Sequence, residues 1–138
     1  MDLLLRSEAA RTYLIEPQLL FVPYLLRLLA SANLNVIATS DDVDAKDIAA
    51  QDPAIIFVDV DFFDRGAPNA ICRIRQVAKA AAIIVVSNAE DPTFEAACYI
   101  SGASAVLSKR TNAEAIVRAV RSIPAPAVVA TSRPMGVA

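Results

Sequence analysis

The stretch at residues 54–61 reads Ala-Ile-Ile-Phe-Val-Asp-Val-Asp and decides the fold of this chain. Its first five residues are apolar, and such a run without polar alternation predicts a parallel β-strand that is covered on both faces. The strand ends at Asp59, and open parallel sheets bind ligands beyond the carboxyl ends of their strands. The alternative is that Asp59 only caps the turn that leaves the sheet, which is common for a single Asp. The other strand ends decide between these two roles.

The length and composition of the chain favour one globular domain. Its 138 residues are 56% hydrophobic, which is enough to bury a substantial core. We expect a lead-in at residues 1–10, one domain at residues 11–123 and a tail rich in Pro and Ala at residues 124–138. The formal net charge of -2 argues against a nucleic-acid surface, and no apolar run is long enough to cross a bilayer. We therefore expect a cytoplasmic protein that binds neither nucleic acid nor membrane.

The sequence contains no histidine. This excludes His-dependent nucleophilic catalysis and His-ligated metal sites, so that carboxylate, hydroxyl and lysine chemistry remains. Cys72 and Cys98 lie far apart and form no Cys-x-x-Cys pair, so we expect both to be small buried side chains in a reducing compartment.

Five strand-helix repeats follow one another along the chain. The apolar runs predict strands at residues 12–15, 34–38, 54–58, 82–86 and 103–107. The intervening patterns predict helices at residues 19–32 and 40–51, from Asn69, from Asp91 to Gly102, and after Thr111, which forms a capping-box pattern with Glu114. Because each helical crossover returns the chain to the same direction, we expect an α/β fold with a five-stranded, doubly wound parallel sheet and helices on both faces.

The strand ends carry four polar side chains that could form one site. Glu16 follows the first predicted strand, Asp59 the third, Ser87 the fourth, and Lys109 the fifth. Since parallel strands share one carboxyl edge, these side chains are expected to lie close together. The alternative is four unrelated polar residues that each end an apolar strand. Their charge types and their order favour a single site.

With these strand ends in place, the chain resembles a response-regulator receiver domain over residues 11–123. The resemblance is carried by Tyr-Leu-Ile-Glu at 13–16, Ile-Ile-Phe-Val-Asp-Val-Asp at 55–61, Ile-Ile-Val-Val-Ser at 83–87 and Gly-Ala-Ser-Ala-Val-Leu-Ser-Lys at 102–109. The helix Ala-Glu-Ala-Ile-Val-Arg-Ala-Val-Arg at 113–121 also fits the family. The resemblance implies the flavodoxin-like fold and a signalling role in two-component phosphorelays, not that of an enzyme.

The resemblance also implies a role for each site residue. Asp59 would accept a phosphoryl group from a sensor histidine kinase or phosphotransfer protein, and Mg²⁺ would offset charge between the carboxylates and the phosphate. Lys109 would be the fixed cation, and Ser87 the hydroxyl that follows the phosphate. Such chemistry needs an in-line nucleophile and positive groups aimed at the equatorial oxygens. The output would be a protein partner that binds the face made by the fourth helix, fifth strand and fifth helix.

The chain departs from the family pattern at several positions. Receivers usually have two adjacent acids after the first strand, whereas this chain has Glu16 followed by Pro17. The expected metal ligands are therefore Glu16, Asp59 and Asp61, the last through its carbonyl or its side chain, and Mg²⁺ affinity should fall. Three positions that take part in switching in the family are also changed: Phe63, Asn88 and Val106.

Two functional hypotheses follow from these observations. The first is an atypical receiver that accepts phosphate on Asp59 and signals through a protein partner or a homodimer. The second is a receiver-like docking or dimerisation module that works without phosphorylation. A nucleotide- or flavin-binding enzyme is disfavoured because the chain has only 3 glycines and no phosphate loop after its first strand. Phe62 and Phe63, beside Asp59, are a candidate hydrophobic docking patch.

Overall fold

In the computed structural model, which describes residues 9–63 and 65–124, five strands form one parallel sheet in the order β2-β1-β3-β4-β5. The strands are β1 (Ala10–Ile15), β2 (Leu34–Ser40), β3 (Ile55–Asp59), β4 (Ala82–Ser87) and β5 (Ala105–Ser108). The helices are the 3₁₀ turn η2 (Leu19–Phe21), α1 (Val22–Ser31), α2 (Ala45–Gln51), α3 (Ala67–Val77), α4 (Pro92–Ser101) and α5 (Ala113–Ser122). The expected five-stranded, doubly wound α/β fold is confirmed.

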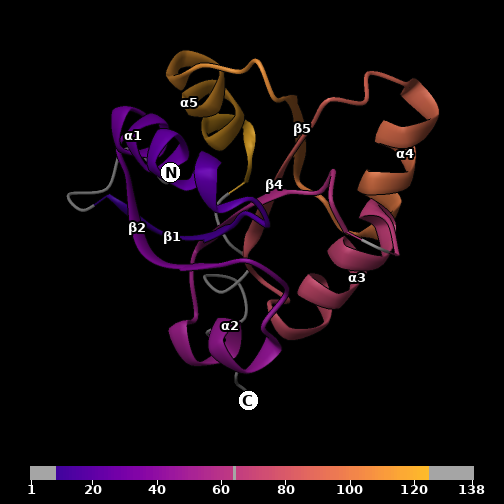
Figure 1. Cartoon of the computed structure of the whole chain (residues 1–138), viewed down its shortest axis with the longest axis horizontal. Helices are drawn as coiled ribbons and strands as arrows, with labels where there is room; N and C mark the ends of the chain where they lie inside the picture. Colours follow the sequence, from indigo (N-terminus) through magenta and orange to yellow (C-terminus); the bar gives the residue numbers. More distant parts are fainter. Residues whose placement is uncertain (1–8, 64, 125–138) are drawn as a thin grey trace.

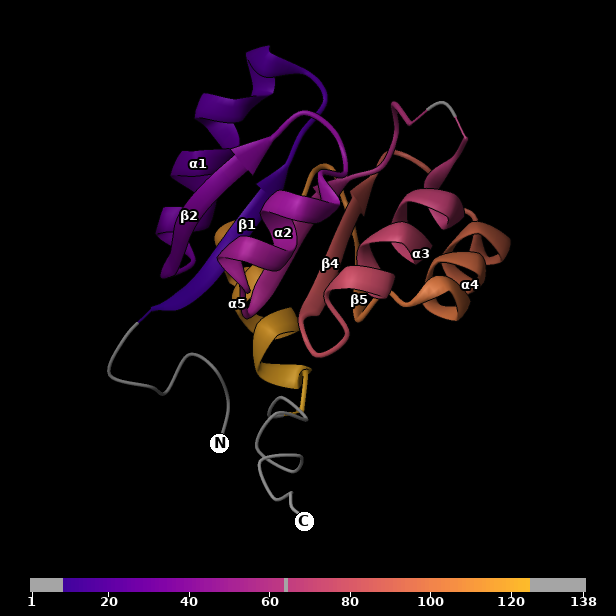
Figure 2. The ribbon, with the colours of Figure 1, turned by 90° about the horizontal axis from the view of Figure 1, so that it is seen from below.

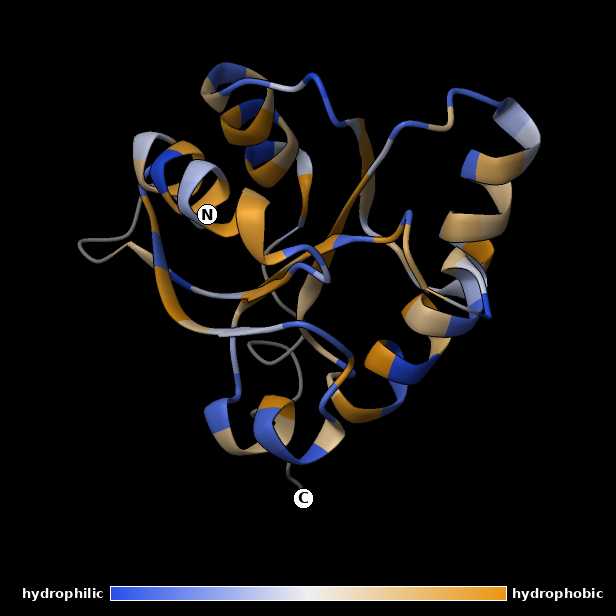
Figure 3. Ribbon diagram, viewed as in Figure 1, coloured by the Kyte–Doolittle hydropathy of each residue, from blue (hydrophilic) through white to orange (hydrophobic). Residues whose placement is uncertain are grey.

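The helices cover both faces of the sheet (Figures 1 and 2). One core cluster joins α1 and α5 to one face, and its buried members include Leu29 and Ile116 around Phe57 of β3. The other cluster joins α2, α3 and α4 to the opposite face, around Ile56 and Val58. Every residue of β3 is buried, because alternate side chains enter opposite cores. In Figure 3 the strands are mainly hydrophobic and the helices are mixed, as expected for helices that cover a sheet.

The start of the first helical segment shows how proline sets its geometry. The expected helix at 19–32 is divided into the short turn η2 and the regular helix α1, with Pro23 in the first turn of α1. A proline is tolerated there because the first N–H groups of a helix have no partner within the helix. The helix α1 ends at Ser31, and Asn33, two residues later, has a φ of 63°, which Asn tolerates better than most residues.

Two local predictions are corrected by the structure. The last helix is capped by Asn112, whose side chain accepts a hydrogen bond from the backbone N–H of Ala115, so Thr111 is not the cap. Cys98 is buried as expected, but Cys72 is exposed. The reason is helical geometry, since Ile71 and Ile74 fill the inner face of α3 and the residue beside Ile71 points away from it.

The predicted domain limits at 11–123 stay a prediction. Within the described residues, the first strand begins at Ala10 and the last helix ends at Ser122. The predicted tail lies, from residue 125 onward, outside the described residues, as does most of the lead-in. None of the helices within residues 9–63 and 65–124 is both long and apolar enough to span a bilayer.

The packing of α1 gives a first prediction. Leu29 is fully buried against the sheet, so Leu29→Ala should lower the free energy of unfolding by about 2–5 kcal/mol through lost burial and the cavity that remains. Leu20, in the preceding turn, is 92% exposed, and Leu20→Ala should change it by less than about 0.5 kcal/mol. Urea unfolding of both variants tests this, and equal effects would contradict the described packing of α1.

Candidate functional site

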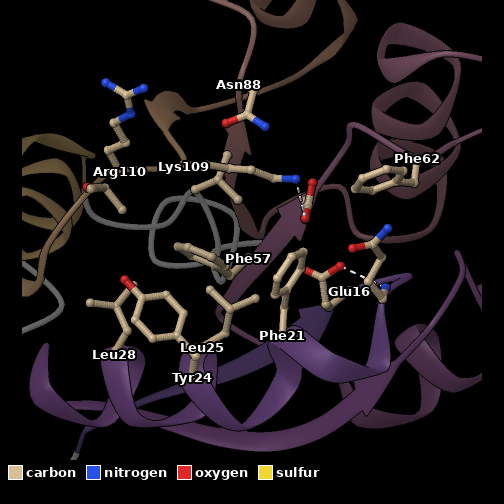
Figure 4. Close-up of a pocket in the computed structure, with 14 residues that line it drawn as sticks. Glu16, Phe21, Tyr24, Leu25, Leu28, Phe57, Phe62, Asn88, Lys109 and Arg110 are labelled. Atoms are coloured by element: carbon tan, nitrogen blue, oxygen red, sulfur yellow. Dashed lines mark hydrogen bonds and ion pairs between the residues drawn. The ribbon is translucent and has the colours of Figure 1, made fainter.

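The parallel register brings the predicted site residues to one edge of the sheet. Asp59 is the last residue of β3, and its partner in β4 immediately precedes Ser87. Ser87 pairs in turn with the residue before Lys109 at the end of β5. Glu16 follows β1, which is the other neighbour of β3. The predicted grouping at the carboxyl edge therefore occurs, and Figure 4 shows two of its members, Glu16 and Lys109.

The ammonium group of Lys109 bridges two carboxylates. Its Nζ lies 2.9 Å from Oδ2 of Asp59 and 2.9 Å from Oδ2 of Asp61. Asp59 is only 1% exposed, so its charge is balanced inside the protein and not by water. Burial alone would lower the pKa of Lys109, but the hydrogen bonds and charges of Asp59 and Asp61 raise it above its ordinary value. Lys109 is therefore held as a cation at this site.

The side chain of Asp61 accepts two further hydrogen bonds at the site. The hydroxyl of Ser87 donates to Oδ1 of Asp61 at 2.6 Å, and the backbone N–H of Asn88 donates to Oδ2 at 2.9 Å. Burial alone would raise the pKa of Asp61, but Ser87, Lys109 and Asn88 together hold it below its ordinary value. The backbone N–H of Asp61 donates to Oδ1 of Asp59 at 3.1 Å. Ser87 is thus bonded to Asp61, with the loop after β3 drawn toward β4.

Glu16 is a buried acid with one unsatisfied oxygen. It is 1% exposed, and its Oε2 accepts the backbone N–H of Gln18 at 2.9 Å. Its Oε1 is buried, and no N–H or O–H group among the described residues donates to it. Burial, followed by hydrogen bonding with Asp59 and the charge of that neighbour, raises the pKa of Glu16 to about 7. Near neutral pH, Glu16 therefore exchanges between its protonated and ionised forms.

The donor set for a metal ion is short. Within residues 9–63 and 65–124, no group of three Asp, Glu, Cys or His side chains is arranged to hold a metal. The free Oε1 of Glu16 and the carboxylate of neighbouring Asp59 are suitable oxygen donors for a hard cation. The side chain of Asp61 already binds Lys109 and Ser87. These residues fit a hydrated divalent ion better than a fully protein-coordinated one.

Aromatic rings cover Lys109. Its Nζ lies 4.7 Å from the centroid of the Phe62 ring and 5.9 Å from that of Phe21, distances at which a cation is attracted to a ring face. Phe62 is 48% exposed, whereas Phe63 packs partly buried against the core around α3. The expected two-residue docking patch is thus reduced to Phe62, because Phe63 fills the space beneath its own loop.

Sequence reasoning missed the role of the first turn after β1. Leu19, Leu20 and Phe21 are exposed hydrophobic residues, and Phe21 and Tyr24 line a cavity of about 470 Å³ that also reaches Asp59. The signal in the sequence was the run Leu-Leu-Phe directly after Pro17-Gln18. Three consecutive residues of a helix cannot all face the core, so a run of three large apolar residues indicates that some of them are exposed.

With the geometry described, comparison with known proteins defines the class of fold. No protein-family model and no curated protein matches the chain. A LuxR-family two-component response regulator from Aurantimonas sp. SI85-9A1 matches with a TM-score of 0.71 and 23% identity, over 84% of this chain and 85% of that one. The chain thus has the fold of response-regulator receiver domains.

Two further structures with this fold were solved with ligands. A response regulator from Burkholderia pseudomallei, with a phosphorylated aspartic acid, calcium ion and citrate, matches with a TM-score of 0.71 and 21% identity, over 82% of this chain and 67% of that one. A chain of the CheX-CheY complex from Borrelia burgdorferi, with BeF3 and Mg²⁺, matches with a TM-score of 0.71 and 17% identity, over 85% of this chain and 90% of that one.

The raised pKa of Glu16 predicts how stability depends on pH. The folded state binds the Glu16 proton more tightly than the unfolded state, so the free energy of unfolding should fall as pH rises from about 4.5 to about 7 and stay lower above it. Glu16→Gln removes this contribution. Relative to the variant, the wild type should lose more than about 1 kcal/mol across that range, since one pKa unit is worth about 1.4 kcal/mol.

Urea unfolding of both proteins at several pH values in EDTA tests this expectation. EDTA removes divalent ions that would favour the ionised form of Glu16. A difference between wild type and Glu16→Gln that does not change with pH would show that Glu16 titrates normally in the folded state.

Proposed function

We propose that this protein is an atypical response-regulator receiver of a two-component phosphorelay, which accepts a phosphoryl group on Asp59. The observation that carries the proposal is the contact between Lys109 and the buried Asp59, on a receiver fold. A phosphoacceptor carboxylate needs a fixed cation that balances the charge of the incoming group. Ser87 at the end of the neighbouring strand supports the same assignment, because it supplies a hydroxyl at that edge.

The reaction would be a transfer onto the protein's own side chain. An oxygen of Asp59 attacks phosphorus, an acyl phosphate forms, and the bond from phosphorus to the phosphodonor breaks. A sensor histidine kinase or a phosphotransfer protein is the expected donor. Lys109 would stay beside the new phosphoryl group, while Ser87 would leave Asp61 to donate to a phosphoryl oxygen. The protein is a signalling domain and, beyond this step, not an enzyme.

A divalent metal is expected to assist, although weakly. When bound, Mg²⁺ would supply positive charge between Asp59 and the phosphoryl group. Glu16 and Asp59 would hold it, with Asp61 the third predicted ligand through its backbone carbonyl. Pro17 provides no side-chain oxygen at the position where receivers usually carry a second acid. The Borrelia and Burkholderia structures described above contain Mg²⁺ and Ca²⁺ respectively, which supports a divalent ion as the type of metal.

The output would be a protein–protein interaction, with a protein partner or with a second copy of the chain. On α4, Tyr99 and Ile100 are 47% and 87% exposed. The Tyr99 hydroxyl accepts a hydrogen bond from the backbone N–H of Val106 at 3.2 Å, which links the exposed face of α4 to β5. These contacts support the predicted docking face at α4, β5 and α5.

The alternative function is a docking or dimerisation module that needs no phosphorylation. A specific observation favours it: the site is already closed, because Asp61 binds both Ser87 and Lys109. Together with the short metal donor set, this arrangement would leave the docking face in one state.

Incubation with acetyl phosphate and Mg²⁺ distinguishes the two functions. Intact mass spectrometry should show one added phosphoryl group on the wild type, lost in Asp59→Asn, because an amide is not a nucleophile for this transfer. Asp52→Asn, which changes an exposed acid before β3 at the opposite edge of the sheet, should be modified like the wild type.

The outcome opposed to the proposal is equally clear. If an ordinary receiver is modified in parallel and the wild-type protein is not, Asp59 is no phosphoacceptor and the docking-module function stands. Modification that persists in Asp59→Asn would assign the phosphoryl group to another residue.

A further inference from the structure

A cavity of about 470 Å³ lies beside the Asp59 site and extends away from it. This volume is within the range of about 300–1,000 Å³ that is usual for small-molecule sites. Its apolar wall comes from η2, α1 and β3, and consists mainly of rings and branched side chains: Phe21, Tyr24, Leu25, Leu28, Phe57. Such a wall favours a flat aromatic ligand, because aromatic side chains stack on rings and exclude water.

Two buried polar atoms of the cavity lining receive no hydrogen bond from any donor among the described residues. They are Oε1 of Glu16 and Oγ1 of Thr111. A buried polar atom without a hydrogen bond costs free energy, and each such atom in a folded protein needs an explanation. The side chain of Glu16 is almost completely buried, with 1% of its surface exposed. A ligand with polar groups would satisfy both atoms.

The two ends of the cavity differ in charge. Glu16 lies at one end and Arg110 toward the other, with Phe21 and Phe57 between them (Figure 4). At the Glu16 end a hydroxyl fits best, since it can donate to a carboxylate or accept from a protonated acid.

The end with Arg110 and Thr111 suits an anion. Within residues 9–63 and 65–124, the ion pairs formed by the site involve Lys109, and none involves Arg110. Arg110 is exposed and has a side chain long enough to reach a ligand in the cavity. A guanidinium and a neighbouring hydroxyl donor together form a suitable pair for a carboxylate.

We infer that this cavity binds a flat aromatic molecule of two or three rings that bears a hydroxyl at one end and a carboxylate at the other. The hydroxyl bonds Oε1 of Glu16, the carboxylate is held by Thr111 and Arg110, and the rings lie against Phe21 and Phe57. The inference does not rest on phosphorylation of Asp59, since every group it uses is present in the unmodified protein.

A suitable probe is 6-hydroxy-2-naphthoate, whose hydroxyl and carboxylate lie at opposite ends of two fused rings. Isothermal titration of the unphosphorylated protein in EDTA should give saturable binding with a dissociation constant below about 1 mM. The analogues 2-naphthoate and 2-naphthol each lack one polar group, and each should bind about tenfold more weakly because one buried partner is lost.

Two variants locate the binding. Leu28→Trp fills the apolar part of the cavity and should abolish binding, with circular dichroism and thermal unfolding as checks of its fold. Arg110→Gln changes an exposed residue and should weaken 6-hydroxy-2-naphthoate about tenfold while leaving 2-naphthol unchanged. Arg118→Gln, an exposed arginine of α5 that does not line the cavity, is the matched control and should bind like the wild type.

Several results would overturn the inference. These are no saturable binding of the probe at millimolar concentration, binding that Leu28→Trp leaves intact in a folded protein, or equal affinity for all three naphthalenes. Because acetyl phosphate and Mg²⁺ are absent from these titrations, failure here is separate from failure of Asp59 to accept phosphate.

Discussion

The ammonium group of Lys109, placed between the carboxylates of Asp59 and Asp61, is the interaction on which the rest of the site depends. Asp59 is held in a nearly dry environment, and a buried anion is tolerated only with a paired cation and further hydrogen bonds. The parallel register of β3, β4 and β5 provides this pairing, because it brings Lys109 beside the end of β3. The register of the strands therefore also determines how the charge of Asp59 is balanced.

The same bridge explains why two functions compete for this site. Lys109 and Asp59 are the groups that phosphoryl transfer needs, whereas Asp61 draws Ser87 and Lys109 into a closed arrangement without any phosphate. An incoming phosphoryl group must therefore outcompete Asp61 for both. Glu16 is buried and its Oε1 accepts no hydrogen bond. Either a metal ion or a ligand in the adjoining cavity would bind this oxygen.

The sequence predicted the sheet well because uninterrupted apolar runs such as 54–58 and 82–86 have few alternatives to buried parallel strands. It also predicted the edge cluster, since topology alone brings strand ends together. The bond between Ser87 and Asp61 was not predictable, because it depends on the conformation of the loop after β3. The cap at Asn112 and the cavity beside Phe21 depend on tertiary contacts that no local pattern encodes.

Binding of beryllofluoride tests the central claim, that Asp59 and Lys109 form a receptor for a phosphoryl group, without any need for a kinase. BeF3⁻ forms a tetrahedral group on a carboxylate oxygen, and amide NMR spectra with Mg²⁺ report where it binds. Saturable shifts are expected around Asp59, Asn88 and Lys109, and they should be absent in Asp59→Asn. Unchanged spectra at saturating BeF3⁻ and Mg²⁺ would contradict the claim.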